Sequence, residues 1–152
     1  ESHDPLAGMA FQRRWEQLAY TLGGRDFYAP AQTVGSFLTG SMPTLSASIA
    51  PTYRPGVTAA ALDGCLPPFV TDSLRQALPL LGRRLTGFDT PEALLTGVET
   101  RSCSGVRLLR GGELQCAMRG LYPCGEGAGW AGGIASAAVD GIRVAEAVAI
   151  QI

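Results

Sequence analysis

The sequence predicts an α+β fold that is mainly helical with a few short strands. Apolar residues recur at helical spacing in three long stretches, near the N-terminus, in the middle and at the C-terminus. Short apolar runs bounded by Gly, Pro and Ser lie between residues 98 and 124 and favour strands. The 152 residues are enough for one ordinary domain with a real core.

The first helix is predicted from about Pro5 to Leu22. Asp4 suits the N-cap, because its carboxylate accepts from free backbone amides, and Pro5 fits the first helical position. Gly23-Gly24 ends the helix. One apolar stripe consists of Phe11, Trp15, Leu18, Ala19 and Leu22. The Trp15 ring could stack on a ligand, but its place on this apolar stripe favours a position in the core.

Shorter elements are predicted next. Residues 26–30 read as a loop, and residues 31–38 as a short helix that buries Val34, Phe37 and Leu38. Residues 40–57 contain three prolines and form a long irregular segment, either a wrapping connection or a ligand contact. A single helical turn is predicted at residues 58–63.

Prolines mark the two helices predicted in the middle of the chain. One begins at Pro67-Pro68, and Pro79 is expected to kink or stop it near Leu78. The other is short and begins at Thr90-Pro91-Glu92, which supplies an N-cap, a first-turn proline and an acidic residue. It is expected to end at about Leu95.

The C-terminal third is predicted as short strands followed by a long helix. The strands are expected at residues 98–103, 106–109, 114–118 and 121–124. The helix over residues 135–150 is expected to bury its apolar face and to expose its polar one. The apolar face consists of Ile134, Ala138, Gly141, Ile142, Ala145, Val148 and Ala149, and the polar face of Ser136, Asp140, Arg143 and Glu146.

Composition excludes several classes of function. The net charge of −1 gives no basic surface for nucleic acid, and no apolar run is long enough to cross a bilayer. The N-terminus is not a signal peptide, so we expect a cytoplasmic protein. Because the sequence lacks an initiating Met, we expect it to be a piece of a longer chain.

Cysteine and histidine usage argues against a metal site. The four cysteines form no C-x-x-C pair, and His3 is the only histidine, so neither a zinc site nor a Ser-His-Asp or Cys-His centre is expected. Reduced thiols are the plain interpretation. A disulfide among Cys103, Cys116 and Cys124 stays open.

A glycine-rich stretch before the terminal helix is the strongest functional candidate. Five glycines between Gly125 and Gly133 allow a backbone to approach another group closely. The helix that follows offers free N–H groups and the positive end of its dipole, which together favour an anionic or electron-rich ligand. A structural turn with an exposed Glu126 is the other interpretation. Residues 127–132 match G-x-G-x-x-G, but no strand with an acidic residue follows, so this is not the start of an NAD-binding fold.

Longer segments around this stretch resemble a known family. Residues 120–129 and 131–141 are similar to the C-terminal flavin-binding motif of bacterial FAD-dependent dehydrogenases, which belong to the flavoproteins with two dinucleotide-binding domains. Upstream segments of the chain resemble the inserted and C-terminal regions of the same family. These segments are residues 29–35, 53–57, 87–89 and 98–101. The resemblance therefore covers nearly the whole chain.

The resemblance implies that this chain is the C-terminal portion of a longer flavoprotein with a Rossmann-like FAD domain. Residues 1–97 would form a mostly helical inserted region on the substrate side. Residues 98–152 would return to the FAD domain as strand, glycine-rich turn and helix. The N-terminal unit that holds the ADP half of FAD is missing from the sequence, so we expect that domain to be a partner from the same polypeptide. The fragment alone is expected to be inactive and to hold no FAD.

The resemblance also implies the roles of individual residues. Glu126 would accept hydrogen bonds from the ribityl chain, and the amides around Gly132, Gly133 and Ile134 would meet the pyrimidine end of the flavin. Gly125, Gly129 and Trp130 complete the cofactor-binding set. Apart from the resemblance, Arg101 and Arg107 flank the first two predicted strands and either neutralise an acidic substrate or NAD(P)H as co-substrate or are surface charges, and Arg101 is the better candidate. No catalytic residue is predicted. Trp130 stands where the family often has tyrosine, and Cys103 and Gly105 lie in a stretch that is often Ser or Thr and Pro.

The sequence is therefore consistent with two functions. The first is an FAD-dependent oxidoreductase, a dehydrogenase whose small-molecule substrate the sequence does not name. The second is a non-catalytic module that binds a partner and contains a structural glycine-rich turn. In either case we expect that faces left uncovered, above all the small-residue side of the terminal helix, promote a homodimer.

Overall fold

The computed structural model describes residues 4–151, so His3 lies outside the described residues. The chain divides into two compact units. The sheet unit comprises residues 14–99, and the terminal-helix unit comprises the residues up to Arg13 together with those from Thr100 onward. Helix α1 (Ala7–Gly23) contributes residues to both. The sequence-based division at residues 97 and 98 stays a prediction about the longer protein.

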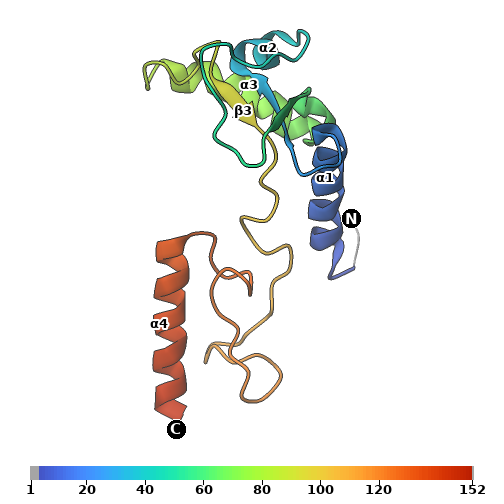
Figure 1. Cartoon of the computed structure of the whole chain (residues 1–152). Coiled ribbons are helices and arrows are strands. Elements are labelled where there is room, and N and C mark those ends of the chain that lie inside the picture. The colour runs from blue at the N-terminus through green and yellow to red at the C-terminus, as the bar shows by residue number, and fades with distance from the viewer. Residues whose placement is uncertain (1–3, 152) are drawn as a thin grey trace. The chain divides into compact units, whose positions relative to one another are not determined.

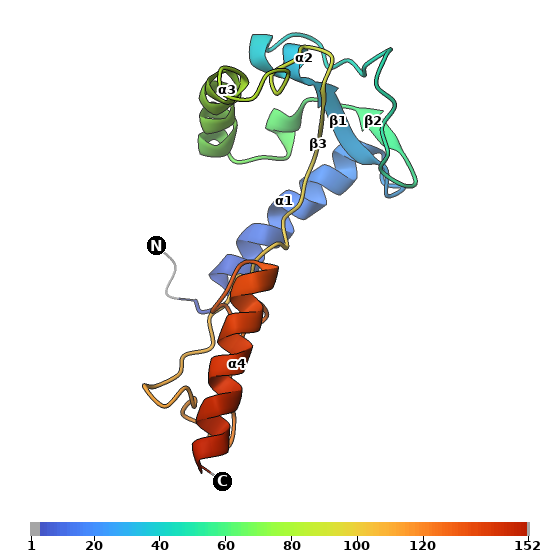
Figure 2. The same ribbon diagram turned by 90° about the vertical axis from the view of Figure 1, so that its left-hand side faces the viewer.

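The sheet unit is built on a three-stranded mixed sheet. Strand β1 (Ala29–Thr33) lies in the middle, between β2 (Val57–Ala59) and β3 (Leu94–Thr96) (Figure 2). β1 pairs parallel with β2 and antiparallel with β3. All five residues of β1 are buried, as expected for a central strand. The α+β class with mostly helical content is confirmed.

Helices account for most of the regular structure (Figure 1). In addition to α1, the elements are α2 (Val34–Thr39), a 3₁₀ turn (Leu62–Gly64), α3 (Pro68–Gly82) and α4 (Ile134–Gln151). Helix α1 begins at Ala7, two residues after the predicted start at Pro5, and Asp4 Oδ1 accepts from the Leu6 amide at 2.9 Å in the turn before it. Thr33 caps α2, where its hydroxyl accepts from the Ser36 amide.

The core of the sheet unit forms around Phe37 and Val34, each about 1% exposed. Both were expected to be buried. The other buried members of the cluster are Ala19, Leu62, Cys65 and Leu78. Trp15 is half-buried, with the Arg14 guanidinium 5.2 Å from its ring centroid.

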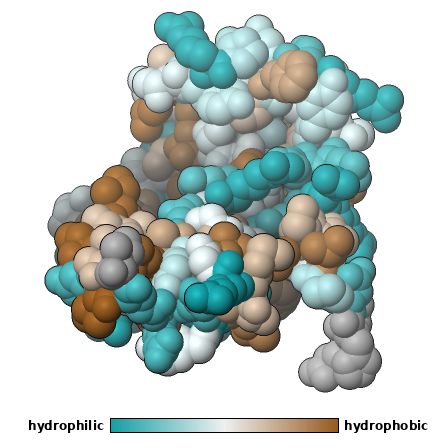
Figure 3. Space-filling model, turned by 90° about the horizontal axis from the view of Figure 1, so that it is seen from below, coloured by the Kyte–Doolittle hydropathy of each residue, from teal (hydrophilic) through white to brown (hydrophobic). Residues whose placement is uncertain are grey.

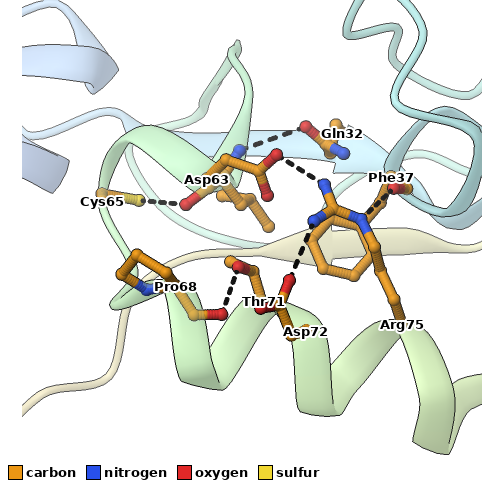
Figure 4. Close-up of polar contacts among 9 residues, drawn as sticks. Gln32, Phe37, Asp63, Cys65, Pro68, Thr71, Asp72 and Arg75 are labelled. Atoms are coloured by element: carbon orange, nitrogen blue, oxygen red, sulfur yellow. Dashed lines mark hydrogen bonds and ion pairs between the residues drawn. The ribbon is translucent and has the colours of Figure 1, made fainter.

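Arg75 of α3 ties the sheet unit together at the edge of this core (Figure 4). Its guanidinium donates to Asp63 Oδ2 at 2.5 Å and to the Phe37 carbonyl at 3.2 Å. It also lies over the Phe37 ring, 4.9 Å from the centroid. On the other side of the 3₁₀ turn, Gln32 Oε1 accepts from the Leu62 amide. These polar contacts join β1, α2, the 3₁₀ turn and α3.

Four local predictions in the sheet unit are wrong. Residues 29–33 form β1, so the loop predicted at 26–30 ends at Tyr28 and the helix predicted at 31–38 begins only at Val34. The turn predicted at 58–63 is a strand followed by the 3₁₀ turn. Residues 94–96 form β3 instead of a helix, because they pair with β1, where Leu94 lies opposite Thr33 and Thr96 opposite Ala31. In each case pairing with distant residues outweighs the local signal.

Pro79 does not end α3, which continues to Gly82. Proline removes its own N–H and crowds the carbonyl four residues earlier. Pro79 lies in the last turn of the helix, where the backbone still closes a bond from the Arg83 amide to the Pro79 carbonyl at 3.3 Å. The irregular course predicted for the chain before Val57 is confirmed, since residues 41–56 contain no helix or strand.

The terminal-helix unit contains α4 but no strand among its described residues. The strands predicted at residues 98–103, 106–109, 114–118 and 121–124 are therefore wrong. The segment runs as turns and extended stretches held by isolated bonds, such as the one from the Leu108 amide to the Ala128 carbonyl. Short apolar runs need a partner strand to form a sheet.

The buried face of α4 also differs from the prediction. Asp140 and Val144 are buried, whereas Ile134 is 94% exposed and Ile142 is 60% exposed. The apolar face is thus uncovered, and the supposedly solvent-facing Asp140 is the residue that packs. Figure 3 shows hydrophobic residues on the surface around the C-terminal end of α4. The helix contacts the rest of its unit through the buried face of Asp140 and Val144 and through Gln151, whose side chain bonds with Tyr122 and Glu113.

No helix among the described residues is long and apolar enough to cross a membrane. Within the same residues, no group of three or more His, Cys, Asp or Glu side chains is placed to hold a metal ion. All four cysteines are free, so the disulfide left open by the sequence is not formed.

Candidate functional site

The glycine-rich turn is closed by its own backbone. The Trp130 amide donates to the Gly125 carbonyl at 3.0 Å, and the Gly129 amide donates to the Glu126 carbonyl at 2.9 Å. Gly125 and Gly129 have φ values of +69° and +78°, which favour glycine. The chain therefore folds back on itself between residues 125 and 130 and then enters α4.

A buried ion pair fixes this turn to α4. Arg110 donates to Asp140 Oδ1 at 2.5 Å and to Oδ2 at 3.0 Å, and its guanidinium also donates to the Pro123 carbonyl at 2.7 Å. Asp140 Oδ2 accepts in addition from the Gly125 amide at 2.9 Å. The side chains of Arg110 and Asp140 are 5% and 11% exposed. One carboxylate thus holds both the turn and the chain that leads into it.

Two arginines lie over the ring of Trp130. Its ring centroid is 4.1 Å from the Arg110 guanidinium carbon and 4.8 Å from that of Arg107. Its indole N–H donates to the Leu108 carbonyl at 2.8 Å, and Arg107 Nε donates to the Gly129 carbonyl at 2.8 Å. A tryptophan face attracts cations, so the two guanidinium groups hold the ring in place. Trp130 therefore supports the turn.

Two neighbouring hollows lie against the turn. The first has a volume of about 380 Å³ and brings Glu126 and Gly127 together with Arg101 and Cys103. The second has a volume of about 360 Å³, and its walls include Trp130 and Gly132. Cys103 and Ser104 line both. The carboxylate of Glu126 and three arginines, Arg13 and Arg101 in the first hollow and Arg107 in the second, therefore line small volumes beside glycine backbone.

The structure brings together most of the residues that the sequence singled out, but not all. Arg101 and Glu126 share the first hollow, and Gly129, Trp130 and Gly132 share the second. Gly125 lies beneath the turn on Asp140. Gly133 and Ile134 line neither hollow, and the Ile134 side chain points into solvent. Their amides belong to the first turn of α4, where N–H groups lack intrahelical partners.

The glycines of the turn differ in what the fold requires of them. At Gly129 a Cβ would lie 2.6 Å from the Val106 carbonyl oxygen, so the fold requires glycine there. At Gly127 a Cβ would meet nothing within 4 Å, and at Gly133 only the Ser136 hydroxyl at 3.6 Å. Neither has a positive φ. The fold of this chain thus gives no reason for glycine at Gly127 and Gly133, and a closely approaching ligand would give one.

Sequence reasoning missed Arg110 and Asp140. A signal was present, because Ala137, Asp140 and Val144 recur at helical spacing and form one face of α4. That face lies beside the predicted apolar stripe. A charged residue such as Asp140 is expected to face solvent there, because the sequence does not show that Arg110, 30 residues away, pairs with it.

The ion pair makes the unit sensitive to acid. Hydrogen bonds from Arg110, and then from the Gly125 amide, lower the pKa of Asp140 from 3.8 to about 2. Because the pKa is lower in the folded state, the stabilisation is fully present above the unfolded value and is lost as the pH falls from about 4 towards 2. In thermal unfolding across this range, we expect the wild type to lose stability more steeply than Asp140→Asn. Parallel profiles for the two proteins would contradict this assignment.

Comparison with known proteins places the chain in a family. Residues 1–102 match the family described as FAD-dependent protein, C-terminal domain-like. A protein from Clostridium beijerinckii (strain ATCC 51743 / NCIMB 8052), described as an uncharacterized protein, is 46% identical over 143 residues. The aligned region is 93% of this chain but 27% of that relative, so the chain spans about a quarter of the relative's length. The family match covers the sheet unit and ends before the glycine-rich turn. The chain belongs to the family of C-terminal domains of FAD-dependent proteins.

Proposed function

We propose that this chain is the C-terminal part of an FAD-dependent oxidoreductase of the dehydrogenase type, and that its glycine-rich turn binds the flavin end of FAD. Family membership supports a flavoprotein parent. The observation that carries the turn's role is the pair Gly127 and Gly133, where the fold itself leaves room for a side chain and the sequence has none. A flat cofactor that approaches the backbone closely explains both glycines.

The donors and acceptors at the turn fit a flavin. Glu126 lines the first hollow and would accept hydrogen bonds from ribityl hydroxyl groups. The amides from Gly132 to Ile134, at the positive end of the α4 dipole, would bind the electron-rich pyrimidine edge and stabilise negative charge there. When bound, the flavin supplies hydride or electron transfer. Arg101 would bind an acidic substrate or NAD(P)H beside it.

The turn can be tested in the full-length natural protein that contains this chain. We expect the purified protein to be yellow and to retain FAD. Glu126→Ala should weaken FAD binding by about 10- to 100-fold, because a hydrogen bond to a charged group contributes about 1.5–3 kcal/mol. Gly133→Val should also lose FAD, because its side chain would occupy the space of the ring.

A matched control separates flavin binding from folding. At Gly112 a Cβ would likewise meet nothing within 4 Å, so Gly112→Val tests the same change outside the turn. It should retain FAD. Residues 1–152 alone should not hold FAD stoichiometrically, since the domain for the ADP half is missing. A colourless full-length protein that takes up no added FAD would disprove the flavoenzyme proposal.

The exposed apolar face of α4 favours a second function, a non-catalytic module that binds a partner. Ile134, Val139, Ile142 and Ile150 are each more than half exposed on this helix. Monomeric proteins seldom expose contiguous apolar patches of this kind. In the flavoenzyme proposal the FAD domain of the same polypeptide covers this face, and in residues 1–152 alone a second copy does. Light scattering that shows a strict monomer of residues 1–152 at high concentration would contradict self-association.

A further inference from the structure

The sheet unit contains a hollow that the flavin proposal does not use. Its volume is about 540 Å³, within the range of small-molecule sites. Every described residue that lines it belongs to the sheet unit and lies within the segment that matches the family. Four of these residues are aromatic, namely Tyr20, Phe27, Tyr28 and Tyr53. From this hollow we infer a second binding site, for a small planar aromatic molecule that carries no charge and is held by stacking.

The loop that presents Phe27 is held in a costly conformation. Phe27 has a φ of +68°, which is a rare value for a bulky side chain, and Arg25 has a φ of +64°. Phe27 is 72% exposed, so burial does not offset the strain. The Tyr20 hydroxyl fixes the loop by donating to the Arg25 carbonyl at 2.6 Å. Strain of this kind gathers at binding sites, where the surrounding structure maintains it.

The other rings are also held in place without being covered. The Tyr20 and Phe27 centroids are 5.3 Å apart, with their planes tilted by 58°. The Tyr28 ring lies so close to Gly56 that a Cβ there would be 2.4 Å from its Cε1 atom, so a residue larger than glycine would displace the ring. Tyr20, Tyr28 and Tyr53 are each exposed by between 39% and 47%. The hollow thus offers fixed aromatic surfaces that a ligand can reach.

The lining provides stacking surfaces and no free counter-charge. Glu16 is the one charged side chain among the described residues that line the hollow, and it already has an interaction partner. No arginine is among these residues, so a bound anion would lose water without gaining a cation. Aromatic faces and edges, by contrast, attract a flat ring that carries no charge. The site therefore differs from the glycine-rich turn, whose hollows are lined by arginines.

Three matched probes test this inference on the full-length natural protein that contains this chain. They are 2-naphthylmethanol, its saturated counterpart decahydro-2-naphthylmethanol and the anion 2-naphthoate, each titrated by isothermal calorimetry. We expect saturable binding of 2-naphthylmethanol, about two- to tenfold tighter than that of the saturated probe, because only a flat ring gains the additional attraction between aromatic groups. Binding of 2-naphthoate should be weaker than that of 2-naphthylmethanol.

Three results would overturn the inference. The first is no saturable binding of 2-naphthylmethanol, which would also be found if another part of the protein covered the hollow. The second is equal affinity for the flat and the saturated probe, because burial of apolar surface alone does not require a flat ring. The third is tighter binding of 2-naphthoate than of 2-naphthylmethanol, which would show that the site is built for an anion.

Phe27→Gly separates binding from folding. Glycine adopts the positive φ without strain, so the thermal midpoint should stay the same or rise, while affinity for 2-naphthylmethanol falls by roughly two- to tenfold. Tyr53→Ala, in the irregular segment before β2, should weaken binding in the same way. Phe69→Ala is the control, because this residue of α3 is 66% exposed and does not line the hollow.

Unchanged affinity in both Phe27→Gly and Tyr53→Ala would overturn the inference, as would an equal loss of affinity in Phe69→Ala. The FAD content of each variant, measured by its visible absorbance, should equal that of the wild type, since none of these residues lies at the glycine-rich turn. The inference does not depend on the flavin, so its failure and that of the proposed function are distinguishable.

Discussion

Phe37→Ala should lower the free energy of unfolding of the sheet unit by about 3–5 kcal/mol, the usual cost of removing a fully buried phenylalanine. Phe37 is about 1% exposed and lies in the core cluster. The ring also carries the Arg75 guanidinium on its face, so the substitution leaves a cavity and removes a cation–π contact together. Arg75 would keep its bonds to Asp63 and to the backbone carbonyl of residue 37.

Urea denaturation of residues 1–152, followed by circular dichroism, measures this effect. Phe69→Ala provides the control, since it removes the same side chain from an exposed position on α3 and should change stability by no more than about 0.5 kcal/mol. Equal losses in the two variants would mean that Phe37 does not occupy the core described here.

Gly129→Ala should destabilise the terminal-helix unit by about 2 kcal/mol or more. A non-glycine residue in the left-handed region costs about 1–2 kcal/mol, and the new Cβ would also lie 2.6 Å from the Val106 carbonyl oxygen. The two nearest atoms, the Val106 carbonyl oxygen and the Arg107 Cα at 2.9 Å, belong to the backbone, so a side-chain rotation cannot relieve the clash. The Arg107 bond to the Gly129 carbonyl would break as the chain shifts.

Gly127→Ala is the matched control within the same turn. Its Cβ would meet nothing within 4 Å, so thermal unfolding of residues 1–152 should hardly change. In the full-length protein the two variants should differ in a second way. Gly129→Ala should lose both stability and FAD, whereas Gly127→Ala should weaken FAD binding alone. If Gly127→Ala retains FAD with wild-type affinity, the glycine at this position is not explained by the cofactor.

The helices were predictable because their signals are local. Pro67-Pro68 marks the start of α3, as the structure confirms, and α1 begins at Ala7, within two residues of the start that Asp4 and Pro5 predict. The strands were not predictable, because they depend on pairing between residues that are far apart in the sequence. β3 forms because the Gly97 amide donates to the Pro30 carbonyl, more than 60 residues away, and because Leu94 pairs with Thr33. A helix-start signal at Thr90 does not compete with those bonds once β1 is in place.

The residues of the candidate site could be predicted from the sequence, but the contacts that hold them in place could not. The glycine spacing and Glu126 stand in the sequence, and the structure places Glu126 in a hollow with Arg101. The support of the turn by Asp140 and Arg110 depends on an approach between segments 30 residues apart, which no local pattern encodes. The flavin roles of Glu126, Gly132 and Ile134 stay a proposal.

By itself, the sequence determined the α+β class, the positions of the long helices, the irregular segment before Val57 and the glycine-rich turn, because caps, prolines, glycines and helical periodicity act within a few residues. Only the tertiary structure decided which strands form and which face of α4 is buried. It also decided that Gly129 serves the fold while Gly127 and Gly133 do not. These outcomes depend on hydrogen bonds, an ion pair and steric contacts between distant segments, which exist only once the chain has folded.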